Sequence, residues 1–546
     1  MVDSTSDTGR PTEAEILVVG AGPVGTTLAL ELARQGVPSV LVERHTERSP
    51  YPKMDFLNGR SMELLRRLGV VDEIRGKGVA PEHAFRFHWS ADFSDEPVSR
   101  WEYASVEELR ERAATVNDGT TGLEAYQRLP GNILEEILRE RAARHPLIDL
   151  RTGTTALSLH QEDDHVTVRL RGSDGDHDLR AGYVVGCDGA GSLVRRQSGI
   201  ALEAHGPSGD HRDVYFRSSD PSLRRHGRFF LNIVATGITL VSRDEGDTWT
   251  AFFPVFEHEE ADEPVETMRR RLGVDLDVDE VMHTATWKGN MAVAARYRRG
   301  RVLLAGDAAH QFYPTGGHGA NTGIGDAVDL GWKLAALTRG WAGPGLLDSY
   351  EAERRPVALF NLEMCANLLE VWGRFPRLAA SGASREILAG FLREEEHQIE
   401  NLAIHFDYRY ASSPAVVAED GPGPRWSWRT TTPGTWPGSR PPHVRLADGT
   451  ALFDLLGAGF TLVDFSPEGV GASAVEAAEK REMPLAHLRV DDEGARALWE
   501  RDLVLVRPDQ HVAWRGSAPP EDWGPVLDTV RGAAGPGHGG AVGSRS

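Results

Sequence analysis

The sequence predicts an α/β protein that consists of a Rossmann-like domain, a mostly antiparallel β-sheet domain inserted into it, and a further α/β domain at the C-terminal end. Three observations predict this arrangement. A glycine-rich turn joins an apolar strand to a helix near the start of the chain, and a strand-like alternation of apolar and polar residues dominates the middle. A stretch rich in Pro, Gly, Ser and Trp then precedes a last segment with its own strand signals.

The length and composition fit a globular enzyme of about three domains. The chain has 546 residues, of which 40% are hydrophobic and 26% charged. A net charge of -21 opposes binding to nucleic acid, and no apolar run reaches the roughly 20 residues of a membrane helix. The polar first residues lack the pattern of a secretion signal. We therefore expect a cytoplasmic protein that binds no nucleic acid and does not span a membrane.

The two cysteines, Cys187 and Cys365, lie far apart and in no metal-ligand or redox spacing. A disulfide framework and a zinc site are therefore not expected. The sequence predicts no metal site.

The first chemical motif is the glycine-rich turn within VVGAGPVGTTLALELA. It follows the apolar run 15–19 and opens a helix over 26–35, and the next strand, 39–43, ends in a glutamate. In a GxGxxG turn the first glycine permits the tight turn, the second lets the backbone approach a pyrophosphate, and the third lets the helix pack on the strand. A structural glycine turn is the alternative. The context favours a dinucleotide site, for FAD or NAD rather than NADP, that includes Gly20, Gly22, Pro23, Val24, Gly25, Glu43 and Arg44.

Two further turns place an aspartate at or just beyond the end of an apolar strand. The first, VVGCDGAGSLVRR, contains Asp188, Gly189 and Arg195. Such turns are common in proteins, but three of them in this order indicate one ligand site at the carboxyl ends of parallel strands. The third motif, which begins at RVLLAGDAAH, contributes Gly306, Asp307, Pro314, Gly317, His318, Gly319, Ala320 and Asn321.

The elements along the chain predict its division into parts. Helical spacing is found at 58–68, 129–144 and 320–339, and strand patterns at 164–171, 179–186, 214–216, 229–234, 248–253 and 301–305. We expect the nucleotide-binding domain at 1–80, 126–200 and 293–410, an insert over the pocket at 81–125, a β-rich substrate domain at 201–292, a linker at 411–442, a third domain at 443–532 and a disordered tail at 533–546.

Together, the motifs resemble those of the single-component flavin aromatic hydroxylases, the family that includes para-hydroxybenzoate and phenol hydroxylases. The sequence is most similar to the longer members that tailor aromatic polyketides and indolocarbazoles, through GGHGANTGIGDAVDLGWKLAA, GWAGPGLLDSYEAERRPVA, RSMELLRRLG and LVRPDQHVAWRG. The resemblance covers nearly the whole chain. It implies an FAD-dependent monooxygenase that consumes NADH or NADPH and oxygen and hydroxylates an aromatic or polycyclic, polyketide-like molecule through a flavin hydroperoxide.

The resemblance also implies roles for single residues. Asp307 would hold a ribityl hydroxyl of FAD, and Asp188 with Arg195 would belong to a fingerprint for FAD and the nicotinamide nucleotide. Gln127 is similar to a glutamine that contacts the flavin, and Lys53 stands where many relatives carry an arginine near the pyrophosphate. The last domain resembles a thioredoxin-like addition, and because it contains no cysteine it cannot perform dithiol chemistry.

The sequence leaves the substrate side open. Four aromatic residues are candidates for the pocket, with core packing as the alternative for each: Tyr215, Phe230, Trp249 and Phe253. No catalytic base is assigned, and a structural role is favoured for His318. A Baeyer-Villiger or epoxidising oxygenase and a flavin protein that binds a ligand without turnover remain alternatives. The protein is expected to be a monomer or a homodimer.

Overall fold

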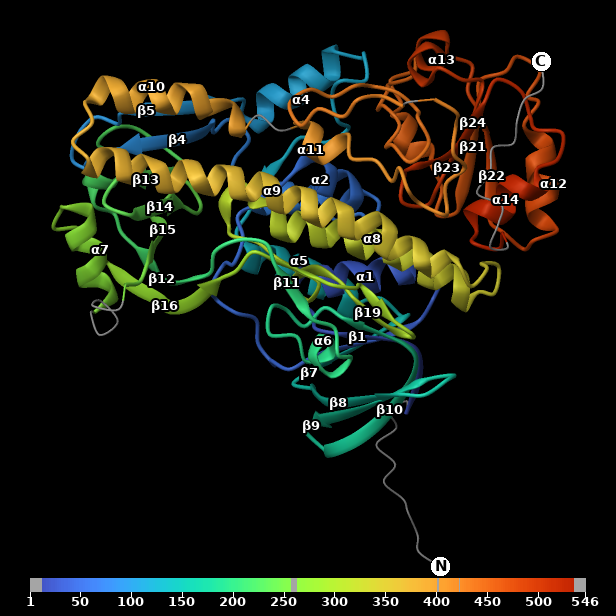
Figure 1. Cartoon of the computed structure of the whole chain (residues 1–546), viewed down its shortest axis with the longest axis horizontal. Helices are drawn as coiled ribbons and strands as arrows, with labels where there is room; N and C mark the ends of the chain where they lie inside the picture. The colour runs from blue at the N-terminus through green and yellow to red at the C-terminus, as the bar shows by residue number, and fades with distance from the viewer. Residues whose placement is uncertain (1–11, 257–262, 400–401, 422, 535–546) are drawn as a thin grey trace, which may run out of the picture.

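The computed structural model describes residues 12–256, 263–399, 402–421 and 423–534, and its centre is a mainly parallel sheet (Figure 1). Strand β1 (Glu13–Val19) lies between β2 (Ser39–Glu43) and β10 (Gly175–Gly186), parallel to both. The full strand order is β18 (Arg298–Arg299), β19 (Val302–Leu304), β10, β1, β2 and β7 (Ile148–Thr152). The central residues of β1, β2 and β19 are buried, as expected for strands covered on both faces.

Helices cover this sheet, and a hairpin extends it. Helix α1 (Pro23–Arg34) packs against α5 (Gly131–Ala143) and α8 (His318–Thr338). Strands β8 (Thr155–Gln161) and β9 (Val166–Gly172) pair with each other, and β9 pairs antiparallel with β10. Short elements connect these parts: β3 (Phe56–Leu57), α2 (Gly59–Arg66), α3 (Val71–Lys77), β6 (Gln127–Arg128), α6 (Leu193–Gln197), β11 (Leu202–Ala204), β17 (Ala292–Ala294) and β20 (His310–Gln311).

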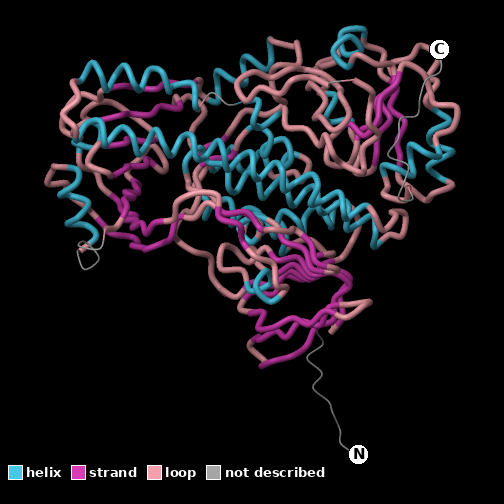
Figure 2. The backbone as a smooth tube through the Cα atoms, viewed as in Figure 1, coloured by secondary structure: helices cyan, strands magenta, loops and turns pink. Residues whose placement is uncertain are grey.

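A second, mostly antiparallel sheet of seven strands lies at one end of the molecule (Figures 1 and 2). Its order is β16 (Glu280–Gly289), β12 (Gly209–Arg217), β15 (Thr248–Pro254), β14 (Ile238–Ser242), β13 (Leu231–Val234), β4 (Phe85–Ser90) and β5 (Ser99–Tyr103). The segment 81–125 therefore supplies two strands to this sheet, and the pair β13 and β4 is parallel. One face of the sheet packs on α7 (Pro264–Leu272), and the other packs on α9 (Leu346–Ala380) and α10 (Arg385–Glu395).

The long helices α8 and α9 run side by side from this sheet towards the C-terminal domain (Figure 1). Helix α8 begins two residues earlier than the sequence pattern predicts, directly after the glycine-rich loop. In the described parts of the chain no helix is both long and apolar enough to cross a membrane. The two helices thus extend from the antiparallel sheet, on which α9 packs, to the C-terminal domain, on which α8 packs (Figure 1).

The C-terminal domain is an α/β unit with a four-stranded sheet. Its order is β22 (Leu485–Arg489), β21 (Phe460–Asp464), β23 (Leu503–Val506) and β24 (Val512–Gly516), in which only β22 and β21 are parallel. Its helices are α12 (Ala472–Glu479), α13 (Glu493–Trp499) and α14 (Gly524–Val530), while α4 (Val106–Thr115) and α11 (Leu402–Phe406) lie between it and the other domains (Figure 1). The expected tail and the polar start fall mostly on residues outside the described ranges.

Candidate active site

The three predicted motifs meet at one edge of the parallel sheet. Strands β1, β10 and β19 are neighbours and end at Val19, Gly186 and Leu304, so the turns that follow them lie side by side. Arg195 Nη1 donates to the carbonyl oxygen of Ala308 at 3.0 Å, which joins the second motif to the third. The structure therefore brings together stretches that are separated by more than a hundred residues.

The glycine turn has the shape that a pyrophosphate site requires. Gly20 has a φ of +104°, and a Cβ atom there would stand 2.4 Å from the carbonyl oxygen of Cys187. A Cβ atom on Gly25 would stand 1.9 Å from the carbonyl oxygen of Gly20. A Cβ atom on Gly22 would meet nothing within 4 Å, so the space in front of the second glycine is open. Pro23 and Val24 start α1, whose N-terminus is capped by no side chain of the described residues, and this geometry fits a dinucleotide phosphate.

Glu43 lies beside this turn at the end of β2. Its carboxylate accepts hydrogen bonds from the backbone N–H groups of Ala21 at 2.9 Å and His45 at 3.0 Å. Arg139 of α5 lies 3.7 Å from the same carboxylate and donates to the carbonyl oxygen of Ala21. Arg44 is exposed and donates to the ring of His45. This end of the site suits a ribose and its adjacent phosphate.

Asp188 and Arg195 hold the second turn in place. The Asp188 carboxylate accepts hydrogen bonds from the backbone N–H groups of Leu193 at 2.7 Å and Val194 at 3.1 Å, so it caps α6. Arg195 is buried and donates to two carbonyl oxygens, those of Ala308 and Ala190. Gly189, with a φ of +80°, has open space around its Cβ position. These residues brace the site, and their own polar atoms are largely satisfied by protein.

Asp307 is the carboxylate best placed to contact a cofactor. Its side chain is exposed, but the surrounding protein desolvates it and raises its pKa above the ordinary value, while His310 and Lys53 lower it. Lys53 is exposed, and its charge lowers the pKa of both Asp307 and Glu135. It therefore places a positive charge near the predicted site of the pyrophosphate.

The turn that carries Asp307 is held from behind by Asp326 of α8. This fully buried carboxylate accepts hydrogen bonds from the backbone N–H of Gly306 at 3.1 Å, from His310 at 2.8 Å and from Arg354 at 2.8 Å. Sequence reasoning missed Asp326, His310 and Arg354. The signal that could have found them is an acidic residue inside the otherwise apolar face of the helix over 320–339.

The loop 314–317 leads into α8, which packs on the turn that carries Asp307. Gly316 and Gly317 have φ values of +78° and +67°, and in the described structure no side chain caps the helix N-terminus. Asn321 fixes the loop, because its carboxamide accepts from the backbone N–H of Asn58 and donates to the carbonyl oxygen of Phe56. Pro314, Gly319 and Ala320 are accessible at this end. Such an end attracts the negative charge of a reduced flavin.

The side chains of His318 and Gln127 have protein neighbours. The imidazole of His318 is buried near His405, with a ring separation of 6.0 Å, and desolvation lowers its pKa to about 4. The same imidazole lies against the loop before α8, because a Cβ atom on Gly316 would stand 2.6 Å from its Nε2 atom. Gln127 donates to the carbonyl oxygens of Val79 and Arg128 and accepts from Arg75. The structure thus gives both side chains protein surroundings.

The antiparallel sheet turns one face towards the cofactor domain, and we call it the cofactor-side face, defined by Asp213, Tyr215, Thr250 and Phe252, which share a side in the strand register. Tyr51, on the segment after β2, packs edge-on against Tyr215 with 6.0 Å between ring centres. Arg243 forms an ion pair with Asp55 on the same segment and donates to Thr250 at 2.9 Å. Sequence reasoning missed Tyr51, Asp55, Asp213 and Arg243, because no local pattern pairs them.

Phe230 belongs to an aromatic cluster next to this face. Phe230 stacks on Phe85 with 5.2 Å between ring centres, and the Arg128 guanidinium lies 4.3 Å from the ring centre of Phe230. Phe56 and Tyr126 are half-buried members of the cluster. Half-buried aromatic rings beside the loop 314–317, which we call the flavin loop, form a wall suited to a flat aromatic ligand.

Trp249 and Phe253 lie on the opposite face, which the structure does not bring together with Tyr215. They are 2% and 1% exposed and pack with Phe216 in the core under α7. Side chains of successive strand residues point to opposite faces, so Phe252, and not Phe253, lies on the cofactor-side face. Core packing, the alternative for both residues, fits their position.

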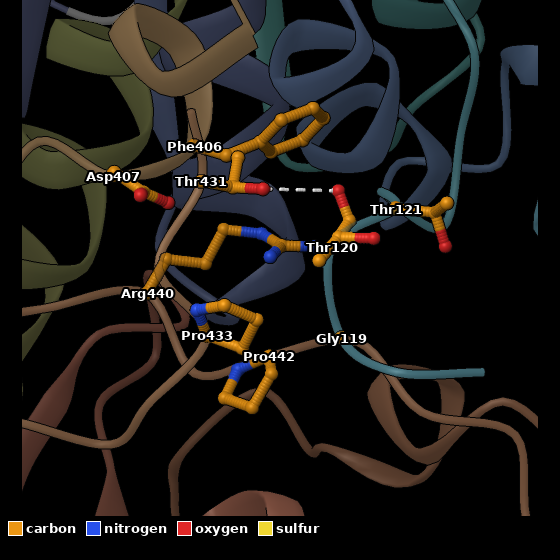
Figure 3. A pocket seen from close by; sticks show the side chains of 9 residues that line it. All are labelled: Gly119, Thr120, Thr121, Phe406, Asp407, Thr431, Pro433, Arg440 and Pro442. Carbon is orange, nitrogen blue, oxygen red and sulfur yellow. Dashed lines mark hydrogen bonds between the residues drawn. The ribbon is translucent and has the colours of Figure 1, made fainter. Parts of the chain in front are cut away.

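Two other places in the described structure have features of a binding site. Within the described ranges, Asp329, Glu353 and Asp509 have the spacing of metal ligands, but Lys333 and Arg507 donate to them, so the group is an ion cluster. A small cleft lies between the 119–121 segment and the linker, where Thr431 donates to the carbonyl oxygen of Thr120 (Figure 3). Its Arg440 is committed to Glu63, and no residue of the predicted site lines it.

Comparison with known proteins shows the family of this chain. Residues 13–363 match the family model described as FAD binding domain, and residues 434–534 match the aromatic-ring hydroxylase C-terminal domain. The chain is 36% identical to the FAD-dependent monooxygenase apdD of Emericella nidulans, over 93% of this chain and 89% of that protein. It is 34% identical to the aklavinone 12-hydroxylase RdmE of Streptomyces purpurascens, over 95% and 98%.

A solved structure extends the likeness to the whole fold. The structure of native and K252c-bound RebC-10x superposes with a TM-score of 0.85 at 33% identity and covers 96% of this chain and 100% of that one. The chain therefore belongs to the FAD-binding aromatic-ring hydroxylases, as an FAD-dependent monooxygenase close to polyketide hydroxylases and to the indolocarbazole enzyme RebC.

Proposed function

We propose that this enzyme hydroxylates a flat, polycyclic phenol of the aromatic polyketide type, with NADH or NADPH as the electron donor. The observation that carries the proposal is that one segment, which follows β2, reaches both the predicted FAD site and the antiparallel sheet. Lys53 of this segment lies near Asp307, whereas Tyr51 and Asp55 contact residues of the antiparallel sheet domain. One segment therefore contacts both the cofactor side and the substrate side.

The chain's own residues would bind FAD along the edge of the parallel sheet. The glycine turn and Glu43 would hold the adenosine part, Lys53 the pyrophosphate, Asp307 the ribityl chain, and the N-terminus of α8 the pyrimidine edge of the flavin. When bound and reduced, FAD supplies the activation of molecular oxygen, while the protein supplies position, electrostatics and exclusion of water. The overall reaction consumes substrate, O2, NAD(P)H and one proton, and yields hydroxylated substrate, water and NAD(P)+.

The aromatic residues favour a polycyclic substrate over a single small ring. Phe56, Phe85, Tyr126 and Phe230 form a continuous group of rings, and Phe252 stacks on Trp372 of α9 at 5.8 Å. Stacking on such rings stabilises extended aromatic ligands. Two relatives support this choice: one is named as a hydroxylase of the polycyclic compound aklavinone, and the other, RebC-10x, has a structure with polycyclic K252c bound.

We also infer that the C-terminal domain is thioredoxin-like, because its strand order and the positions of its helices follow that arrangement. It contains no cysteine, so its contribution is structural. Between residues 26 and 534 the GxGxxG spacing does not recur, which supports transient docking of the nicotinamide nucleotide over the FAD domain.

The test is a substrate screen with the purified flavoprotein. Aklavinone, other aromatic polyketides and indolocarbazoles would be tested for ligand-stimulated oxidation of NADH and NADPH, with mass spectrometry of the products. We expect a product that carries one added oxygen atom as a hydroxyl group on an intact ring. Ring expansion to a lactone would indicate Baeyer-Villiger chemistry instead, and NAD(P)H oxidation without any oxygenated product would contradict the proposal.

A further inference from the structure

The four sequence stretches that carry the resemblance to the tailoring enzymes meet at one buried joint between domains. They occupy residues 60–69 on and after α2, 316–336 on α8, 340–358 at the start of α9, and 505–516 around the turn between β23 and β24. The joint consists of the loop 507–511 of that turn and the side chains that it contacts on α2, α8 and α9. Because the stretch on α8 begins in the flavin loop, the joint lies next to the proposed flavin site.

Arg60 is the residue of α2 that reaches the loop 507–511. It lies in the first turn of α2 and is 3% exposed. Its Nη2 donates to the carbonyl oxygen of Asp509 at 2.8 Å, and its Nη1 donates to the side-chain oxygen of Gln510 at 2.9 Å. The same Nη1 lies 3.1 Å from the carboxylate of Glu63. Glu63 also accepts hydrogen bonds from Arg440, so its charge stays paired when Arg60 is replaced.

The start of α2 is bonded on its other side to the flavin loop. Asn58 is the N-cap of α2, two residues before Arg60, and its backbone N–H donates to the carboxamide oxygen of Asn321 at 2.9 Å. The carboxamide nitrogen of Asn321 donates to the carbonyl oxygen of Gly317 at 2.6 Å. A short series of hydrogen bonds therefore leads from the C-terminal domain to the backbone of the flavin loop.

A small cavity lies between the first turn of α2 and the first turn of α8. Its lining includes Asn58, Arg60, His318, Asn321 and Asn361. Groups that line a cavity lack packing partners on that side, so close packing alone does not fix their position and directed hydrogen bonds have more influence. The place of the flavin loop therefore depends on the bond between Asn58 and Asn321, and so on where α2 begins.

We propose that Arg60 is a positioning residue, through which the loop 507–511 of the C-terminal domain holds the flavin loop where it stabilises the reduced flavin. This goes beyond the structural contribution given to that domain above, and it rests on the proposed placement of the flavin at the N-terminus of α8. A helix N-terminus stabilises a nearby negative charge, and the effect falls off within one turn. A small displacement of the flavin loop would therefore weaken the binding of the reduced, anionic flavin more than that of the oxidised flavin.

Other contacts keep the C-terminal domain docked when Arg60 is replaced. Arg507 is ion-paired with Glu353 of α9. Trp332 of α8 packs edge-on against Phe460 of β21, with 5.7 Å between ring centres. A variant at Arg60 therefore tests the position of the start of α2 rather than the docking of the domain.

Arg66 offers a matched control on the same helix. It lies in the last turn of α2 and donates two hydrogen bonds, both 2.8 Å long, to Asp454 of the C-terminal domain. Both arginines thus tie α2 to that domain, but Arg60 lies beside Asn58, whereas Arg66 lies at the opposite end of the helix. A general interdomain tether predicts equal effects of the two substitutions, and a positioning role of Arg60 predicts unequal ones.

The experiment compares Arg60→Met, Arg60→Lys and Gln510→Ala with the wild-type protein and with Arg66→Met. The midpoint potential of bound FAD is measured in each holoenzyme by equilibration with redox dyes. Hydrogen exchange of the backbone amides of 314–323 is measured in the FAD-free proteins by mass spectrometry. Gln510→Ala removes one acceptor of Arg60 and leaves Arg60 itself in place, so it decides the question if Arg60→Met does not fold.

We expect Arg60→Met to weaken the binding of reduced FAD about tenfold relative to that of oxidised FAD, which equals a fall of about 30 mV in the two-electron midpoint potential. Hydrogen exchange at 314–323 should become faster, because the flavin loop loses its support. Arg60→Lys should restore part of both values, and Gln510→Ala should change both in the same direction as Arg60→Met. Arg66→Met should behave as wild type.

Two kinds of result would overturn the proposal, and they can be told apart. Unchanged exchange in Arg60→Met and Gln510→Ala, or an equal change in Arg66→Met, would remove the role of Arg60 and leave the proposed placement of the flavin untouched. Faster exchange with an unchanged midpoint potential would remove the link to the flavin, together with its placement at α8. Neither measurement needs a substrate, so both are independent of the proposed substrate class.

Discussion

Arg507 of the C-terminal domain donates two hydrogen bonds to Glu353 of α9, at 2.6 and 2.8 Å, and both side chains are fully buried. Arg507 also bonds Asp509 at 2.6 Å, and Lys333 of α8 donates to Asp329 at 2.7 Å. The C-terminal domain is thus anchored in the helices that follow the flavin loop. Its loss would leave buried charges without partners.

Replacing Arg507 by Met should lower the free energy of unfolding by about 3–5 kcal/mol, since a buried carboxylate cluster loses its cation. Urea unfolding followed by fluorescence would measure the change. Arg496→Met in the same domain, at an exposed ion pair with Asp502, is the matched control and should cost less than about 1 kcal/mol. Equal effects of the two substitutions would contradict the importance of the cluster.

Two alanine substitutions in the glycine turn should separate folding from cofactor binding. Gly25→Ala places a Cβ atom 1.9 Å from a backbone oxygen, so the turn must distort and the protein should fail to fold or to hold FAD. Gly22→Ala meets no protein atom within 4 Å. That variant should fold normally, but its affinity for FAD should fall by about tenfold or more, because the added methyl group occupies the space predicted for the pyrophosphate. Circular dichroism and flavin titration report the two effects, and normal FAD affinity in Gly22→Ala would count against this placement of the pyrophosphate.

Asp307→Ala should weaken FAD binding by about tenfold or more, through the loss of a charge-assisted hydrogen bond. Because the side chain of Asp307 is exposed, the stability of the FAD-free protein should stay the same or rise slightly. Flavin titration and thermal unfolding of apoprotein and holoprotein would test both parts. An unchanged flavin dissociation constant would remove Asp307 from the site.

Acid should destabilise the fold through the two buried histidines behind the loop 314–317, His318 and His405. Desolvation lowers the pKa of His318 to about 4 and that of His405 to about 3, and proximity to His318 lowers the latter further. In the unfolded chain both titrate near about 6.5, so their contribution to stability is complete above that pH and is lost as pH falls towards the folded values. The slope is about 1.4 kcal/mol per pH unit for each histidine. His405→Gln should flatten this loss between roughly pH 6.5 and 4, measured by urea unfolding at each pH, whereas an unchanged slope would refute the assignment.

Neighbouring phenylalanines of β15 should have different roles. Phe253 is 1% exposed in the core under α7, so Phe253→Ala should lower stability by about 3–5 kcal/mol. Phe252 is half-buried on the cofactor-side face against Trp372, so Phe252→Ala should raise the KM for a polycyclic substrate with a smaller stability loss. Parallel unfolding and steady-state measurements would test this, and the reverse pattern would show that the wrong face had been assigned to the pocket.

The cofactor half of the site was predictable because its geometry is encoded locally. A glycine turn or an aspartate at the end of a parallel strand has a fixed position relative to that strand, and neighbouring parallel strands end at the same edge of the sheet. Gly20, Asp188 and Asp307 therefore came together as expected once β1, β10 and β19 paired. The supporting residues Asp326 and Arg354 were not predicted, because they lie on helices and bind to the back of the turn that carries Asp307.

The substrate half depended on tertiary structure. Tyr51 and Asp213 are separated by 162 residues, and their contact exists only because the segment after β2 lies against the inserted sheet. The strand pattern around Phe252 and Phe253 alternates, but a period of two does not say which face turns towards the cofactor.

The sequence alone thus determined the α/β class and the family, and it predicted the edge of the sheet at which FAD would bind. The choice of the pocket-side face and the pairing of distant polar groups were decided by how the domains pack, because those contacts depend on surfaces that no single segment carries.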